Sequence, residues 1–145
     1  MEQPWPTDGE GVVTLPSGRR VRGRGLRGGD PLLCGLAPQF GLYLLGRTPP
    51  STTWERCWVD WPDFRLPRNP AAARTAFEQA LERSARQRVE VACAGGTGRT
   101  GTTLACLAVL DGVPAADAVA WIRTHYRPRA VETPGQRRFV QRFGH

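Results

Sequence analysis

Cys93 and Arg99 open and close a glycine-rich loop whose spacing points to phosphate chemistry. The loop, Cys-Ala-Gly-Gly-Thr-Gly-Arg, follows the apolar residues Val89 and Val91 and precedes the apolar run 104–110, so it joins a buried strand to a helix. Such a turn directs successive backbone N–H groups into one concavity at a helix N-terminus, where the helix dipole favours an anion. The Cys93 sulfur would lie at the centre of this ring, and the Arg99 guanidinium would hold two phosphate oxygens. The pattern predicts a cysteine nucleophile that attacks a bound phosphate.

The remaining residues of the loop are expected to serve the same site. Glycine fits a backbone that must adopt positive φ and approach a ligand closely. A helix N-terminus beside a cation favours the thiolate over the thiol, and the Thr100 hydroxyl is placed to steady that thiolate. The residues expected to bind the substrate through this loop are Ala94, Gly95, Gly96, Thr97, Gly98 and Arg99.

Two other interpretations of the loop stay open at this point. A kinase-type or ATPase-type phosphate loop, GxxxxGK[ST], needs a lysine, and all 20 basic residues of this chain are arginine, which disfavours that class. The loop could also be a glycine-rich turn that carries Cys93 only as a small buried side chain, because free cysteine often acts as a compact hydrophobe.

A second motif, Trp61-Pro62-Asp63, lies 30 residues before Cys93. Together the two segments resemble the cysteine-based protein tyrosine phosphatase superfamily, and its compact dual-specificity branch in particular. CAGGTGRT matches the C-x5-R-[ST] signature of that family, Trp61-Pro62-Asp63 matches its mobile acid loop, and the resemblance covers roughly residues 41–143. It implies hydrolysis of a phosphomonoester through a cysteinyl-phosphate intermediate.

The resemblance also implies roles for two residues outside the loop. Asp63 would protonate the leaving oxygen and then act as the base, and Gln136 would orient the water that hydrolyses the intermediate. Asp60 is a local rival for the acid, but it precedes the hinge at Trp61 and is expected to end a strand or to pair with an arginine. The Thr-x-x-Gln sequence from Thr133 to Gln136 equally fits a capping box, so both roles of this glutamine stay open.

Ala92 is where the chain departs from the family it resembles. The family usually has a histidine directly before the nucleophile, and here that position is alanine. Alanine offers no hydrogen bond, so the loop would have to be ordered by Thr100, the helix dipole and its own N–H groups.

Strand and helix patterns around the loop predict a single α/β domain over residues 1–145, with residues 1–9 as a frayed terminus. Strands are expected at about 12–15, 19–22, 40–45, 55–61 and 89–93, and helices at about 70–86, 104–111, 114–126 and from 133 onward. The central sheet should have four or five strands, mostly parallel, flanked by helices on both faces. The site would then lie at the carboxyl edge of the strand that ends near Cys93.

The charge distribution gives weaker indications. Five arginines lie on or beside the second strand, between Arg19 and Arg27, and we expect a solvated edge strand there or, alternatively, a rim that attracts an anionic substrate. The net charge of +7 favours an acidic partner, and nucleic acid remains possible on this ground alone. The four cysteines lack metal-ligand spacing, and we expect no metal and no cofactor. No apolar segment stands at the N-terminus, so we expect a cytoplasmic protein without a membrane association.

Three functions therefore remain as hypotheses. The first is a metal-independent protein tyrosine or dual-specificity phosphatase that acts on a phosphorylated protein or a small phosphomonoester. The second is a phosphatase for a nucleotide, an RNA end or a phosphoinositide, which the arginine excess would suit. The third is a catalytically silent phospho-binding module.

Overall fold

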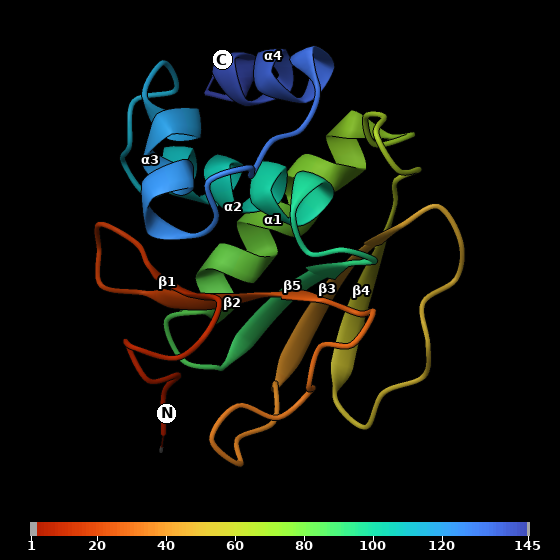
Figure 1. Ribbon diagram of the computed structural model, residues 1–145, viewed down its shortest axis with the longest axis vertical. Coiled ribbons are helices and arrows are strands. Elements are labelled where there is room, and N and C mark those ends of the chain that lie inside the picture. The colour runs from red at the N-terminus through yellow and green to blue at the C-terminus, as the bar shows by residue number, and fades with distance from the viewer. Residues whose placement is uncertain (1–2, 145) are drawn as a thin grey trace.

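The computed structural model of the chain describes residues 3–144, which form one α/β domain (Figure 1). Its sheet has the strand order β1-β2-β5-β3-β4; β1 pairs antiparallel with β2, and every other pair is parallel. The strands described are β1 (Val12–Thr14), β2 (Arg20–Gly25), β3 (Phe40–Leu45), β4 (Glu55–Asp60) and β5 (Val89–Cys93). The helices described are α1 (Pro70–Arg83), α2 (Gly98–Leu110), α3 (Ala118–His125) and α4 (Pro134–Arg142). The predicted α/β class and mostly parallel sheet are confirmed.

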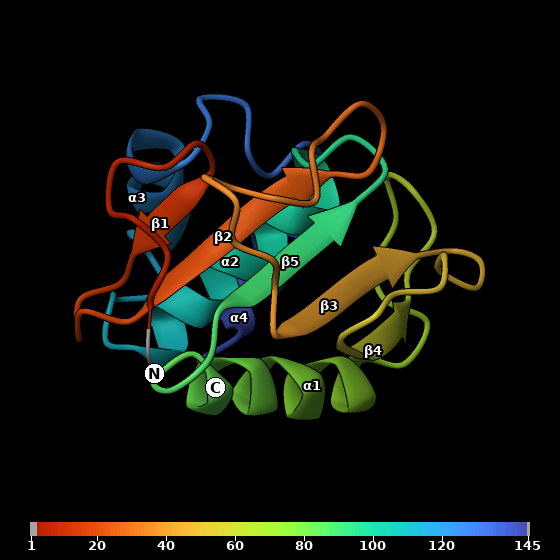
Figure 2. The same ribbon diagram turned by 90° about the horizontal axis from the view of Figure 1, so that it is seen from below.

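The helices all lie on one side of the sheet, so the expectation of helices on both faces is wrong (Figure 1). Turned by 90°, the molecule presents the other face, which is crossed by loops and the N-terminal segment (Figure 2). The reason lies in the alternation of the strands. On β5, Val89, Val91 and Cys93 face the core shared with α1 and α2, whereas Glu90 faces away from it. A buried carboxylate offers no apolar surface on which a helix could pack.

Local signals explain where the first two helices begin. The Asn69 side chain accepts a hydrogen bond from Ala72 N and Pro70 follows it, as predicted for the start of α1. Helix α2 begins at Gly98, well before the apolar run that predicted it. Its first turns contain Gly and Thr, which are weak helix formers, but the residues from Gly98 to Ala108 are buried. Tertiary packing therefore overrides local propensity here and places Arg99 within the first turn of the helix.

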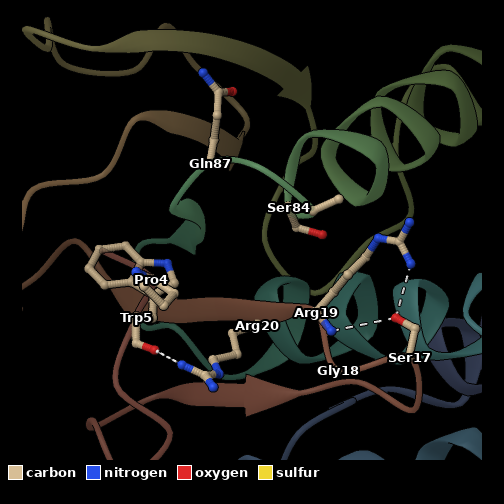
Figure 3. A pocket seen from close by; sticks show the side chains of 9 residues that line it. Pro4, Trp5, Ser17, Gly18, Arg19, Arg20, Ser84 and Gln87 are labelled. Carbon is tan, nitrogen blue, oxygen red and sulfur yellow. Dashed lines mark hydrogen bonds between the residues drawn. The ribbon is translucent and has the colours of Figure 1, made fainter. Parts of the chain in front are cut away.

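The N-terminal segment is not frayed over the residues that the structure describes. Trp5 is buried, and its indole Nε1 donates to Val89 O at 2.9 Å. Arg20 on β2 donates back to Trp5 O at 2.8 Å, at the wall of a cavity of about 420 Å³ (Figure 3). Residues 1 and 2, which the expectation also covered, lie outside the described part. The segment thus forms part of the cover on the helix-free face.

A buried polar cluster, the outer-face network, occupies the middle of that face. Its members are Arg22, Arg24, Tyr43, Trp54 and Glu90. Arg24 forms a bidentate pair with Glu90, with Nε 2.6 Å from Oε1 and Nη2 2.9 Å from Oε2. Tyr43 donates to the same carboxylate at 2.8 Å and accepts from Trp54 Nε1 at 2.7 Å. Burial, together with the Glu90 charge, raises the pKa of Tyr43, so its hydroxyl stays protonated and donates.

Arg22 and Arg24 correct a further expectation. The second strand is not a solvated edge, because β2 lies between β1 and β5. The side chains of Arg22 and Arg24 on its outer face are buried. The predicted hairpin between β1 and β2 is confirmed by its antiparallel register.

We predict that Glu90→Gln lowers the free energy of unfolding by about 3–5 kcal/mol, because it leaves two buried guanidinium groups without a carboxylate. Tyr43→Phe serves as the comparison and should cost less, about 1.5–3 kcal/mol, since it removes one hydrogen bond to that carboxylate. Urea unfolding of both variants measures the difference. A loss below 1 kcal/mol in Glu90→Gln would show that the network does not depend on its charge.

Candidate active site

The phosphate loop, residues 93–99, connects the end of β5 to the start of α2. Gly96 has a φ of +74°, which favours glycine, and its N–H donates to the Cys93 sulfur at 3.2 Å. The end of β2 supports the loop from outside: Leu26 N donates to Cys93 O at 2.9 Å and Arg27 N donates to Ala94 O at 3.0 Å. The sulfur is therefore held on the concave side of an anchored turn.

Arg99 joins the phosphate loop to the acid loop, residues 61–65. Its side chain is buried; Nη1 donates to Trp61 O at 3.0 Å, and Nη2 lies 3.5 Å from Asp63 Oδ1. Its Nε is buried and has no hydrogen-bond partner among residues 3–144. One edge of the guanidinium thus fixes the acid loop, while Nε retains a donor for another acceptor, such as a phosphate oxygen.

One cavity of about 160 Å³ brings the three expected catalytic groups together. Cys93, Arg99 and Asp63 all line it, and so do Gly95, Thr97 and Gly98 of the phosphate loop. The rival Asp60 is turned away and pairs with Arg68, whose Nε lies 3.0 Å from Asp60 Oδ1. Asp63 is half-exposed at the cavity.

The acid loop is held by an aromatic anchor. Trp61 is fully buried, its ring packs against Phe77 and Phe139, and its Nε1 donates to Arg65 O at 2.7 Å. Phe64 has a φ of +61°, an uncommon conformation for a residue with a side chain, and it is largely exposed beside the cavity. The loop is thus pinned at Trp61 and strained next to Asp63.

Two of the expected site residues, Thr100 and Gln136, do not line the catalytic cavity. The Thr100 hydroxyl is buried without a partner in the described residues, so it forms no hydrogen bond with the Cys93 sulfur in this structure. Gln136 is buried, completes the capping box with Thr133 and does not line the cavity. Its Nε2 donates to Arg65 O at 3.4 Å, so the glutamine links α4 to the acid loop.

Sequence reasoning missed three residues at the loop. Tyr126 donates to Gly96 O at 2.6 Å, and Arg127 Nη1 donates to Gly95 O at 3.0 Å and Thr97 Oγ1 at 3.1 Å. These side chains thus occupy the carbonyl oxygens of Gly95 and Gly96 in the loop. Glu132 lines the cavity as well, and a Cβ at Gly98 would collide with its carboxylate. The sequence indicated Tyr126 only as a residue packed in the core, because no local pattern connects it with a loop 30 residues away.

Ala92 is buried on the outer face, in register with Arg24 on one neighbouring strand and Tyr43 on the other. The outer-face network therefore lies next to the position where the similar family has histidine. Glu90, two residues before Ala92 on β5, ties Arg24 and Tyr43 together. The network thus links β2 and β3 to the strand that carries Cys93.

The other cysteines have different surroundings from Cys93. Cys106 in α2 and the half-buried Cys57 both have a raised pKa because burial disfavours their thiolates. Cys34 is exposed on a loop far from the phosphate loop in the sequence, and all four cysteines are free of disulfides.

Residues 3–144 contain no cluster of His, Cys, Asp or Glu that could hold a metal ion. None of the helices described there is long and apolar enough to cross a membrane.

Residues 44–143 match the family model described as protein-tyrosine phosphatase. The chain belongs to this family. It is also similar to two uncharacterized proteins of Methanocaldococcus jannaschii. MJECL20 is 46% identical over 55 residues, which are 38% of this chain and 36% of that protein. MJ0215 is 44% identical over 57 residues, or 39% of this chain and 35% of that protein. The match thus spans about a third of these curated relatives.

Several solved structures share the fold. Tk-PTP in its active form superposes with a TM-score of 0.64 at 24% identity and covers 74% of this chain and 78% of its own. Human DUSP28 gives 0.62 at 18% identity over 98% and 96% of the two chains. PTPMT1 in complex with PI(5)P gives 0.62 at 18% identity over 74% and 76%. These likenesses establish the architecture that surrounds the cavity.

Proposed function

We propose that this protein hydrolyses phosphomonoesters in two steps, through a cysteinyl-phosphate formed on Cys93 and without a metal ion. The observation that carries the proposal is the single cavity lined by Cys93, Arg99 and Asp63 at the start of α2. A nucleophile, an anion clamp and a proton donor are the three groups that this reaction needs. Membership of the protein-tyrosine phosphatase family supports the same chemistry. Since a nucleophilic thiolate needs reducing surroundings, we place the protein in the cytoplasm.

In the first step the Cys93 thiolate attacks phosphorus, and the bond from phosphorus to the leaving oxygen breaks. The proton of the Asp63 carboxyl group passes to that oxygen. The N–H groups of residues 94–99, together with Arg99, hold the three equatorial oxygens as negative charge shifts. One of these donors, the Gly96 N–H, is directed at the Cys93 sulfur.

In the second step the Asp63 carboxylate takes a proton from water, and the water oxygen attacks phosphorus. The bond between sulfur and phosphorus breaks, the thiolate is restored and inorganic phosphate leaves. Gln136 would have to leave its capping box to orient this water, so we assign activation of the water to Asp63 and assign Gln136 to holding the acid loop through Arg65.

The leading substrate class is a phosphorylated protein, with phosphotyrosine and also phosphoserine or phosphothreonine. Phe64 supports it, because this exposed aromatic ring lies beside the cavity, where it can contact a phenyl leaving group. The alternative is a non-protein phosphomonoester. Among proteins of similar fold, PTPMT1 was crystallised with PI(5)P and SIW14 of S. cerevisiae is named a PP-IP phosphatase.

A substrate panel with the purified protein separates these classes. Phosphotyrosine and phosphoserine peptides, PI(5)P and a nucleoside monophosphate are compared by phosphate release, with and without EDTA. Turnover that survives EDTA supports the metal-free mechanism, and the highest kcat/KM identifies the class. Binding of these compounds without release of phosphate would instead establish a silent phospho-binding module.

We predict that Arg99→Lys lowers kcat/KM by about 100-fold, the size of effect seen when one transition-state donor is removed. A lysine ammonium is a point charge, and it cannot bind two phosphate oxygens while also holding Trp61 O. Arg138→Lys on α4 is the matched control, since Arg138 does not line the catalytic cavity. If Arg99→Lys keeps most of its activity, the clamp has been assigned to the wrong side chain.

A further inference from the structure

A second polar cavity adjoins the active site on the outer side of the phosphate loop. Its volume is about 450 Å³, and it is walled by β2, the segment 27–33 and Arg127. Arg27 and Gly95 line both this cavity and the catalytic one. The two spaces are therefore neighbours that share part of one wall.

Positive charge is in excess at this cavity. Four arginines line it, and Arg24 among them is already neutralised by its bidentate pair with Glu90. The cavity has two carboxylates of its own, Glu10 and Asp30, which act against an anion; Asp30 Oδ1 is engaged by Leu32 N. The remaining guanidinium groups outnumber these carboxylates. They are Arg22, Arg27 and Arg127.

Arg22 is the member of this set that most needs an anion. Its side chain is 6% exposed, yet its two Nη groups donate to carbonyl oxygens, those of Pro31 and Asp30. Its Nε is buried without a partner among residues 3–144, and Glu90, 3.7 Å from Nη1, is held by Arg24. Two buried cations thus share one carboxylate. This carboxylate supplies a single negative charge for the two cations, so a bound anion would stabilise the arrangement.

We infer that this arginine pocket, formed by Arg22, Arg27 and Arg127, binds a second phosphate group of the substrate whose first phosphate is attacked by Cys93. The inference rests on the proposed phosphomonoester hydrolysis. Of the two substrate classes named there it supports the alternative one, a non-protein phosphomonoester, in the form of small molecules that carry phosphates on neighbouring carbons, against the phosphorylated protein that Phe64 favours. Arg127 fits this role because it lines the pocket and also bonds to Gly95 and Thr97, two residues of the phosphate loop that line the catalytic cavity.

The closeness of the two cavities favours a small molecule over a peptide. Phosphates on adjacent carbons are fixed next to each other by the covalent frame. Two phosphorylated side chains of a peptide must instead be ordered at an entropic cost before they reach neighbouring pockets. The shared wall at Arg27 and Gly95 matches the first arrangement.

Calorimetry on the full chain carrying Cys93→Ser tests binding independently of turnover. The probes are orthophosphate and myo-inositol hexakisphosphate, and the measured quantity is the ratio of their affinities. We expect hexakisphosphate to bind at least ten-fold more tightly. Arg22→Met should reduce this preference about ten-fold. Arg127→Met should also reduce it, and this variant tests the inference if Arg22→Met fails to fold. Arg138→Met removes the same charge elsewhere and should leave the preference unchanged.

The kinetic arm compares 2,3-bisphosphoglycerate with 2-phosphoglycerate in the enzyme with Cys93 intact. A kcat/KM ratio above ten that falls in Arg22→Met supports the inference. If the protein hydrolyses no phosphomonoester but calorimetry shows the preference, the proposed function fails while the pocket stands. Three results would overturn the inference. The first is equal affinities for orthophosphate and hexakisphosphate. The second is a loss of preference in Arg138→Met as large as that in Arg22→Met, and the third is a doubly phosphorylated peptide that binds more tightly than hexakisphosphate.

Discussion

Cys93→Ser is expected to abolish turnover of an aryl phosphate while vanadate and phosphate still bind. The serine hydroxyl is a far poorer nucleophile at neutral pH, and removal of a catalytic nucleophile costs on the order of 10⁶-fold in kcat. The anion ring persists, because it consists of backbone N–H groups that the end of β2 and Tyr126 hold in place. Hydrolysis of p-nitrophenyl phosphate and calorimetric titration with vanadate measure the two properties separately.

Cys106→Ser is the matched control for this prediction. Cys106 is buried in α2, outside the catalytic cavity, so its replacement should affect stability and leave the chemistry intact. Undiminished turnover in Cys93→Ser would remove the covalent mechanism. Loss of vanadate binding in that variant would instead mean that the sulfur itself orders the loop.

Asp63→Asn should lower kcat by the 10²–10⁴-fold typical of general acid catalysis, with the largest loss for substrates whose leaving groups are poor. Asparagine keeps the shape of the side chain but cannot donate a proton to an alkoxide. Activated aryl esters leave without help and should suffer less. A series of aryl phosphates with leaving groups of different acidity measures this dependence.

Asp60→Asn provides the comparison, since Asp60 pairs with Arg68 and does not line the cavity. We expect it to change kcat by less than about two-fold, as is usual for an exposed ion pair of small energy. An equal loss across all leaving groups in Asp63→Asn, or a greater loss in Asp60→Asn, would move the acid role to another residue.

The sequence was informative wherever the determinants of the site are local. The phosphate loop could be placed because a buried strand, a glycine-rich turn and an apolar helix follow one another without interruption. The N-terminal caps of α1 and α4 could be predicted for the same reason. The Thr-x-x-Gln pattern correctly indicated a capping box at Thr133. The competing role of Gln136 depended on where α4 lies relative to the cavity, and the local pattern does not contain that information.

The features of the fold and the site that could not be predicted from the sequence depend on contacts between segments far apart in the chain. Five arginines near β2 indicate a solvated strand when they are considered alone. Arg24 is buried in an ion pair with Glu90, which is 66 residues away in the sequence. Only the parallel register of β2 with β5 brings the two side chains together. The same polar cluster explains why one face of the sheet has no helix. Tyr126, Arg127 and Glu132 were missed likewise, because their contacts with the loop arise only when α3 and the segment after it fold back.

The hydrogen bond from Arg99 to Trp61 O has a consequence for inhibition. In the proposed mechanism one guanidinium would hold the phosphate and, through Trp61 O, the acid loop, so the free energies of anion binding and of this loop contact would be coupled. Such coupling is reciprocal. We expect a compound that binds beside Phe64 and breaks the contact between Arg99 and Trp61 O to weaken phosphate affinity, and phosphate to weaken that compound's affinity by the same factor. A non-phosphate inhibitor of this protein can therefore act at the edge of the cavity without entering the ring of N–H groups.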